Sequence, residues 1–110
     1  MGISVDLNCD MGEGMLTDAA IMPYISSVNI ACGYHAGDEN MMQKTIELAL
    51  INKVRIGAHP SFPDRQNFGR TAMNFSPNEV YDMVKKQLEL IASIAAKKNC
   101  SLNHVKPHGA

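Results

Sequence analysis

Carboxylates, histidines and a lysine gather at four places in this sequence, each on or just after a short stretch rich in apolar residues. The four groups are Asp6, Asn8, Asp10 and Glu13; Cys32, His35 and Asp38; His59; and Lys106 with His108. Side chains of these types transfer protons, hold divalent metals and bind carboxylates. If the apolar stretches are parallel strands, all four groups lie at the carboxyl ends of the strands, where α/β enzymes build their active sites. The spacing therefore predicts an enzyme.

Each group could also have a purely structural role. The alternating polar residues of the first stretch could simply face solvent, unless that strand is central in the sheet. His35 or His59 alone could be a hydrogen-bonded loop residue, and Cys32 could be a nucleophile near His35 or a buried structural thiol. Two histidines and an aspartate could instead form a divalent-metal site with an open position for water. The sequence has no HExxH motif, so spacing alone does not decide between these alternatives.

Two further features bear on binding. Lys106 ends an apolar stretch, where an amine could bind a carboxylate or move a proton. The segment 12–14, Gly-Glu-Gly, predicts a flexible turn, and it lacks the complete GxGxxG and GxxxxGK[ST] patterns of phosphate-binding loops. The turn therefore gives little support for nucleotide binding.

The elements that must position these groups alternate between strands and helices. We expect strands over 3–8, 28–32, 54–58 and 103–106, long helices over 39–52 and 77–98, and a short helical turn capped by Thr17 and Asp18 and limited by Pro23. This order is typical of an α/β protein with a parallel sheet.

Both long helices have a predicted start and an apolar face. Asp38 is expected to cap the first helix, and Ser76 forms a capping box with Glu79 at the start of the second. The apolar positions are Met42, Ile46, Ala49 and Leu50 on the first helix, and Val80, Met83, Val84, Leu88, Ile91, Ile94 and Ala95 on the second. This periodicity predicts that each helix packs one face against the sheet.

Composition narrows the class of protein. The chain has 110 residues, 45% of them hydrophobic, and a formal net charge of -1, which predicts one globular domain over 1–110 and gives no basic surplus for nucleic acid or anionic membranes. Its apolar stretches are far shorter than the roughly 20 residues of a membrane-spanning helix, and its first residues lack the pattern of a signal peptide. Three widely spaced cysteines suggest a reducing compartment. We expect a cytoplasmic protein that binds neither nucleic acid nor membrane.

The expected elements cover only part of a closed barrel. A (β/α) barrel typically needs about 250 residues, and the last expected strand has no following helix to cover it. We therefore expect the N-terminal part of a larger protein. Uncovered strand edges with apolar faces also predict self-association.

Several longer motifs carry a resemblance to a known family. They are DLNCDMGEG over 6–14, NIACGYHAGD over 29–38, IGAHPSFPD over 56–64, FGR over 68–70 and HVKPHGA over 104–110. In order and spacing, these segments resemble the motifs of the LamB/YcsF lactam-utilisation family. The resemblance runs from about residue 5 to the last residue.

The resemblance implies both a fold and an activity. Members of this family resemble the A subunit of bacterial 5-oxoprolinase, which opens the lactam ring of 5-oxo-L-proline to give L-glutamate, coupled to ATP hydrolysis and in company with subunits B and C. The implied fold is an incomplete (β/α) barrel similar to polysaccharide deacetylases and other carbohydrate-acting enzymes. The expected cofactor is ATP, with a divalent metal as a further option.

The same resemblance suggests roles for individual residues. The expected catalytic residues are Asp10, His59 and Lys106; the expected substrate-binding residues are Asn8, Glu13, Asp38, Arg70 and His108. Deacetylases of similar fold hold a metal with one aspartate and two histidines, and by position Asp10, His35 and His59 match that set.

Three functional hypotheses follow. The first is a lactam-opening enzyme component in which a carboxylate activates water or a phosphorylated intermediate, while Lys106 and His108 bind the substrate carboxylate or the developing oxyanion. The second keeps the fold but makes the protein a metal-dependent deacetylase of N-acetyl sugars. The third is a fragment that has no catalytic activity alone. A stoichiometric divalent metal would favour the second hypothesis over the first.

Overall fold

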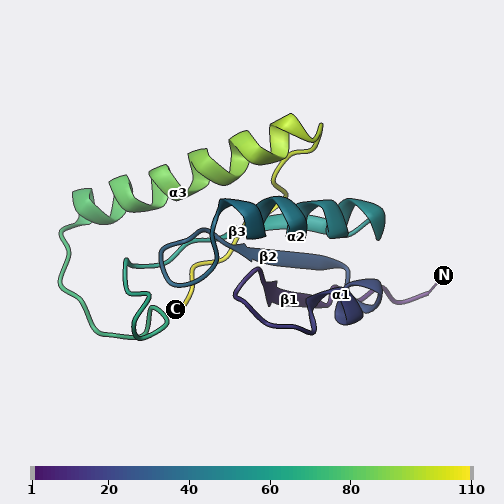
Figure 1. The fold of residues 1–110 in the computed structure, drawn as a ribbon, viewed down its shortest axis with the longest axis horizontal. Helices are drawn as coiled ribbons and strands as arrows, with labels where there is room; N and C mark the ends of the chain where they lie inside the picture. The colour runs from purple at the N-terminus through teal and green to yellow at the C-terminus, as the bar shows by residue number, and fades with distance from the viewer. Residues whose placement is uncertain (1, 110) are drawn as a thin grey trace.

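Four parallel strands, in the same order as in the chain, form the sheet that supports the rest of the molecule. The structure is a computed structural model that describes residues 2–109. Its elements are β1 (Asn8–Met11), α1 (Asp18–Ile21), a short 3-10 helix η1 (Met22–Tyr24), β2 (Ser27–Ala31), α2 (Glu39–Ile51), β3 (Arg55–His59), α3 (Pro77–Lys97) and β4 (His104–Val105). The predicted α/β class with a parallel sheet is confirmed (Figure 1).

The two long helices start where the sequence predicts. The Asp38 side chain accepts a hydrogen bond from the backbone N–H of Met41 at the start of α2. At the start of α3, Ser76 and Glu79 form both hydrogen bonds of the capping box. Because both caps satisfy backbone donors that a helix leaves free at its first turn, they fix where each helix begins.

One face of the sheet packs on these helices and forms the core. Helices α2 and α3 lie on the same side of the sheet (Figure 1). Because side chains alternate between the two faces of a strand, the apolar residues of β2 and β3 that pack on these helices share one face. The buried apolar residues shared by these elements are Val28, Ile30, Met42, Ile46, Ala49, Ile56, Ala58, Ile91, Ile94 and Ala95. The opposite face of the sheet is polar, and it carries the residues considered below.

The predicted first strand is wrong. Residues 3–7 are not a strand, and Ile3, Val5 and Leu7 are 96%, 68% and 56% exposed. The paired strand begins at Asn8, because the register of β1 on β2 starts at Asn8 opposite Ser27. Alternation of apolar and polar residues thus predicted a strand in this part of the chain but not the residues that pair.

Smaller differences concern the helices. Leu50, expected on the buried face of α2, is 41% exposed, whereas Thr45 is buried there. Thr17 stands at the N-cap of α1 but its side chain makes no capping bond; Asp18 accepts instead from the backbone N–H of Gly12. On α3 the buried apolar residues lie in the second half of the predicted stripe, while the first half is only partly covered. Among residues 2–109, none of the helices is long and apolar enough to cross a membrane.

We predict that the core depends on α3 through Ile91, which is fully buried. Replacing Ile91 with Ala leaves a cavity, so the free energy of unfolding should fall by about 2–5 kcal/mol. Ile51→Ala is the matched control, because Ile51 is 77% exposed and its loss should change stability by less than about 0.5 kcal/mol. Chemical denaturation of both variants measures the difference, and equal effects would contradict the described packing.

Candidate active site

A row of four residues crosses the polar face of the sheet. Asp10 pairs in register with Asn29, Asn29 with Gly57, and Gly57 with His104. Gly57 has no side chain, and the His104 ring occupies that space: a Cβ at Gly57 would collide with the ring. The ring therefore reaches across β3, and its Nε2 lies 2.6 Å from Oδ1 of Asn29.

This row forms a directed chain of hydrogen bonds that ends on Asp10. Since an amide oxygen only accepts, Nε2 of His104 carries the proton, and its Nδ1 accepts from the Asn103 amide at 3.1 Å. The buried Asn29 amide then donates to Oδ1 of Asn8 and to Oδ1 of Asp10, at 3.0 Å each. Because His104 donates to the amide oxygen of Asn29, the amide nitrogen faces Asp10 and orients its carboxylate.

Asp10 is held as a carboxylate between a lysine and a histidine. Its Oδ1 lies 3.1 Å from Nζ of Lys106, and its Oδ2 lies 3.4 Å from Nε2 of His59. Burial alone would raise the pKa of Asp10, but the hydrogen bonds from Asn29 and Lys106 outweigh it and lower the pKa below its ordinary value. Asp10 is therefore ionised at neutral pH, and about one third of its side chain remains open to solvent.

Beside Asp10, one carboxylate and three histidines form a buried cluster. Glu13 follows β1, His35 follows β2, His59 ends β3 and His108 follows β4. Nε2 of His35 lies 2.6 Å from Oε2 of Glu13, and its ring stacks on that of His108 with centroids 3.8 Å apart. His59 meets both rings edge-on. Burial lowers the pKa of His59, so its ring is neutral at neutral pH.

The loop between β3 and α3 supports this cluster. Both carboxylate oxygens of Asp64 accept backbone N–H groups of the loop, from Asn67 and Thr71, and the Asp64 carbonyl accepts from Gly69. Gly69 adopts a φ of 72° and approaches so closely that a Cβ there would collide with Ser61 and His35. A larger residue at 69 would therefore displace the cluster.

A buried glutamine ties the same loop to α3. The Gln87 amide oxygen accepts from the backbone N–H of Ser61, and its nitrogen donates to the Ser61 carbonyl, both at 2.9 Å. Farther along, the backbone N–H of His108 donates to the Pro60 carbonyl. The chain segments that follow β3 and β4 therefore run side by side into the site.

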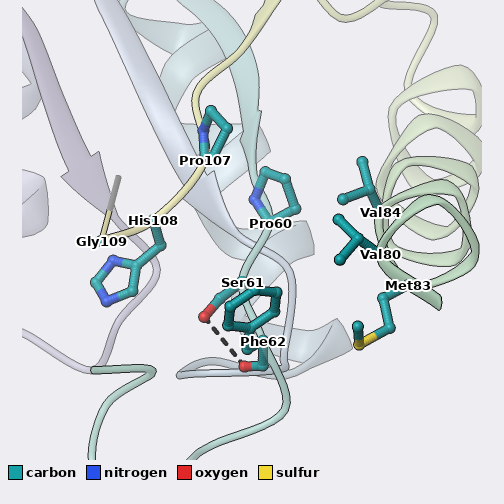
Figure 2. A pocket seen from close by; sticks show the side chains of 9 residues that line it. All are labelled: Pro60, Ser61, Phe62, Val80, Met83, Val84, Pro107, His108 and Gly109. Atoms are coloured by element: carbon teal, nitrogen blue, oxygen red, sulfur yellow. Dashed lines mark hydrogen bonds between the residues drawn. The ribbon is translucent and has the colours of Figure 1, made fainter. Parts of the chain in front are cut away.

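Two hollows meet at His108. One, of about 280 Å³, lies between the first half of α3 and the loops, where Val80, Met83 and Val84 face Phe62 while the His108 ring lies on the side away from the helix (Figure 2). The other, of about 290 Å³, is lined by Phe62, Arg70 and His108 among others. The first hollow is apolar, and the second has both Arg70 and His108 in its lining.

Comparison with known proteins identifies the family of this chain. A family model described as the LamB/YcsF family matches residues 5–110. The chain belongs to the LamB/YcsF family. The resemblance stated from the sequence motifs is thereby confirmed.

Similar proteins in this family are longer than this chain. The chain is 54% identical to the 5-oxoprolinase A subunit of Tolumonas auensis and 50% identical to the 5-oxoprolinase A subunit of Bacillus cytotoxicus, over 96% and 98% of its own length. It covers 44% of the first relative and 45% of the second. The chain thus spans a little under half the length of these relatives.

A solved structure shows the same fold. The crystal structure of the lactam utilization protein from Thermus thermophilus matches with a TM-score of 0.94 and 42% identity, over 98% of this chain and 46% of that chain. The fold class expected from the sequence, part of a (β/α) barrel, is confirmed by this match and by the strand order.

The structure brings most of the predicted LamB/YcsF site residues together. Asp10, His35, His59 and Lys106 converge at the carboxyl ends of the strands, with Glu13 and His108 beside them. Asn8 joins through Asn29, and Arg70 lines a hollow shared with His108. Asp38 is different, because its carboxylate caps α2 and is exposed.

The predicted metal set differs from the group that the structure assembles. Among the described residues, the ligand atoms that lie within 4.8 Å of one another belong to Glu13, His35, His59 and His108. One carboxylate oxygen of Asp10 lies near His59 of this group, and the other pairs with Lys106, which lies outside the group. Both histidines of the expected triad belong to this group, and the carboxylate within it is Glu13 rather than Asp10.

Sequence reasoning missed Asn29, Gly57, His104 and Gln87. The sequence held a signal for Asn29 and for His104. Asn29 and Ser27 are polar at alternate positions of a strand that is otherwise apolar, and His104 stands two residues before Lys106. Alternation puts each of these pairs on one face of its strand. Gln87 gave no signal, because a polar residue within an amphipathic helix is usually exposed.

We predict that Gly57→Ala breaks the row that orients Asp10. The added methyl group should push the His104 ring aside, cost about 1–3 kcal/mol of stability and raise the pKa of Asp10 toward its ordinary value. Chemical denaturation and carboxyl NMR titration measure these two effects. In a His104→Ala background the same substitution should cost less, because the ring is gone.

Gly2→Ala is the control, since nothing lies within 4 Å of a Cβ there. An undiminished cost of Gly57→Ala in the His104→Ala background would show that the ring is not what the methyl group meets.

Proposed function

We propose that this chain acts in an ATP-dependent 5-oxoprolinase, as the part of the A subunit that carries the hydrolytic site, and that it works in the cytoplasm with subunits B and C. The substrate would be 5-oxo-L-proline or a similar small lactam, and the product L-glutamate. Two relatives named as the A subunit of 5-oxoprolinase, at 54% and 50% identity, support the proposal. The observation that carries it is the ionised Asp10 held between Lys106 and His59 at the carboxyl edge of the sheet.

The chemistry of lactam opening fits this pair. Water adds to the lactam carbonyl, the C–N bond then breaks, and the released ring nitrogen takes up a proton. In this proposal Asp10 accepts the proton of the attacking water, and the Lys106 ammonium stabilises the oxyanion that forms. Asp10 can then pass this proton on to the leaving nitrogen, while a catalytic role of the neighbouring His59 stays a prediction. ATP hydrolysis would supply the free energy, because opening an unstrained amide is unfavourable near neutral pH.

The substrate carboxylate needs a cation outside this pair. Arg70 lines the hollow that also contains Phe62 and His108, so its guanidinium could pair with a carboxylate there while the apolar part of the ring contacts Phe62. Substrate contacts of Asn8, Glu13, Asp38 and His108 stay predictions. The side chains of Glu13 and His108 are already engaged within the histidine cluster.

A second candidate function rests on that cluster. A metal-dependent deacetylase of N-acetyl sugars needs a site with histidine and carboxylate ligands, and Glu13, His35, His59 and His108 have ligand atoms within 4.8 Å of one another. Release of acetate from an N-acetyl sugar, with no dependence on ATP, would favour this function over lactam opening. Self-association and the hypothesis of a fragment without activity of its own also stay predictions.

We predict that Asp10 and Lys106 are essential for lactam opening. Because this chain spans 44% of the Tolumonas auensis relative, the test uses a chimera in which it replaces the matching part of that relative, and the chimera is assayed with subunits B and C. Asp10→Asn and Lys106→Ala should each lower the ATP-dependent formation of L-glutamate by roughly 10²–10⁴-fold, as expected for loss of a general base and of a group that stabilises the oxyanion.

Matched controls come from exposed helix positions. Asp82→Asn on α3 and Lys44→Ala on α2 change the same residue types away from the site and should leave turnover unchanged. Near-normal turnover of the Asp10 or Lys106 variant would contradict their roles. A folded chimera without any 5-oxoprolinase activity would contradict the proposed function itself.

A further inference from the structure

Backbone carbonyl groups fix which nitrogen of two cluster histidines carries the proton. Nδ1 of His59 lies 2.6 Å from the Lys106 carbonyl oxygen, and Nε2 of His108 lies 2.7 Å from the Phe68 carbonyl oxygen. A carbonyl oxygen can only accept a hydrogen bond, so each of these nitrogens is an N–H donor. In the neutral rings, the other nitrogen is left with a lone pair.

Those two lone pairs point at each other. Nε2 of His59 and Nδ1 of His108 are 3.1 Å apart. Oε2 of Glu13 lies 3.9 Å from each of them, and Oδ2 of Asp10 lies 3.4 Å from the His59 nitrogen. None of these four atoms brings a hydrogen to the others. Four electron-rich atoms at such distances repel one another unless a cation lies among them.

His35 can supply a further ligand nitrogen beside these atoms, because its ring can change tautomer. Its Nε2 donates to Glu13 at 2.6 Å, while its Nδ1 is buried and, among the described residues, has no hydrogen-bond partner. If the proton moves to Nδ1, Nε2 becomes a ligand atom next to the Glu13 carboxylate. The ring is held for this purpose by its stacking on His108 and by the close approach of Gly69.

We propose that Glu13, His35, His59 and His108 together bind one divalent transition-metal ion. Their ligand atoms lie within 4.8 Å of one another, close enough for a single ion to draw them together. Metal-binding histidines typically donate their other N–H to a backbone carbonyl, as His59 and His108 do. Three imidazoles favour zinc and its neighbours, whereas calcium and magnesium prefer oxygen ligands.

This donor set assigns separate tasks to the two carboxylates. Glu13 binds the ion, and Asp10, held by Asn29 and Lys106, stays outside as a proton acceptor. The inference rests only on the geometry of the cluster, so it stands whether the reaction is lactam opening or deacetylation. A proton shared between His59 and His108 is the competing explanation of the same contacts.

The test is direct metal binding by this chain, after removal of metals with a chelator and under reducing conditions. Isothermal titration with Zn²⁺ should show one equivalent bound, and Co²⁺ should give the visible absorption of a nitrogen- and oxygen-ligated site. Zn²⁺ should raise the thermal midpoint, while Mg²⁺ should neither raise it nor compete. Absence of stoichiometric Zn²⁺ binding, in the chain and in the chimera, would overturn the proposal in favour of the shared proton.

Four variants test the donor set, with circular dichroism as the check of folding. His108→Gln and Glu13→Gln should weaken Zn²⁺ binding by more than the roughly 10–100-fold that loss of a ligand's outer hydrogen-bond partner costs. His104→Gln removes the one histidine outside the cluster, and Asp10→Asn removes the carboxylate of the alternative triad; both should still bind one equivalent. Loss of binding in Asp10→Asn with retention in His108→Gln would overturn the assignment.

Discussion

In-register pairing of four parallel strands is the constraint on which this site depends. It puts Asp10, Asn29, Gly57 and His104 in one row on the face of the sheet that the helices leave uncovered. The bare Cα of Gly57 gives the His104 ring its place, and the ring orients the Asn29 amide. A shift of one residue in any strand would turn these side chains to the apolar face and break the row.

Lys106 connects this row to the histidine cluster. Its ammonium group binds Asp10, and its carbonyl oxygen fixes the tautomer of His59. One residue therefore controls both the charged pair proposed for proton transfer and the direction of a lone pair in the neighbouring cluster. The Phe68 carbonyl oxygen fixes the tautomer of His108 in the same way. Asp64 and Gln87 hold the loops near these contacts. The buried histidine cluster and the partly exposed Asp10 carboxylate are thus connected through Lys106, although they differ in solvent access.

Local signals in the sequence predicted the parts of the fold that depend on local physics. Asp38, Ser76 and Glu79 begin the long helices as expected, because capping involves residues only three positions apart. The convergence of Asp10 and His59 was also predictable, since carboxyl ends of parallel strands share one edge. The prediction of a strand at residues 3–7 was wrong, because alternation of apolar and polar residues does not show which residues pair with another strand.

Strand register and loop conformation could not be predicted from the sequence. Gly57 and His104 are 47 positions apart, and only the register of β3 on β4 reveals that one makes room for the other. Glu13 reaches His35 because Gly12 turns the chain with a φ of 71°, so Glu13 rather than Asp10 joins the histidines. A motif shows which residue types are available, but the register and this turn decide which carboxylate joins the cluster.

The central claim is that His59 and His108 face each other with unprotonated nitrogens. Long-range ¹H–¹⁵N NMR of the metal-free chain, at a pH where both rings are neutral, reads the tautomer of each histidine directly. The structure predicts the Nδ1–H form for His59 and the Nε2–H form for His108, because the carbonyl groups of Lys106 and Phe68 hold those protons. A proton on Nε2 of His59 or on Nδ1 of His108 would contradict the account.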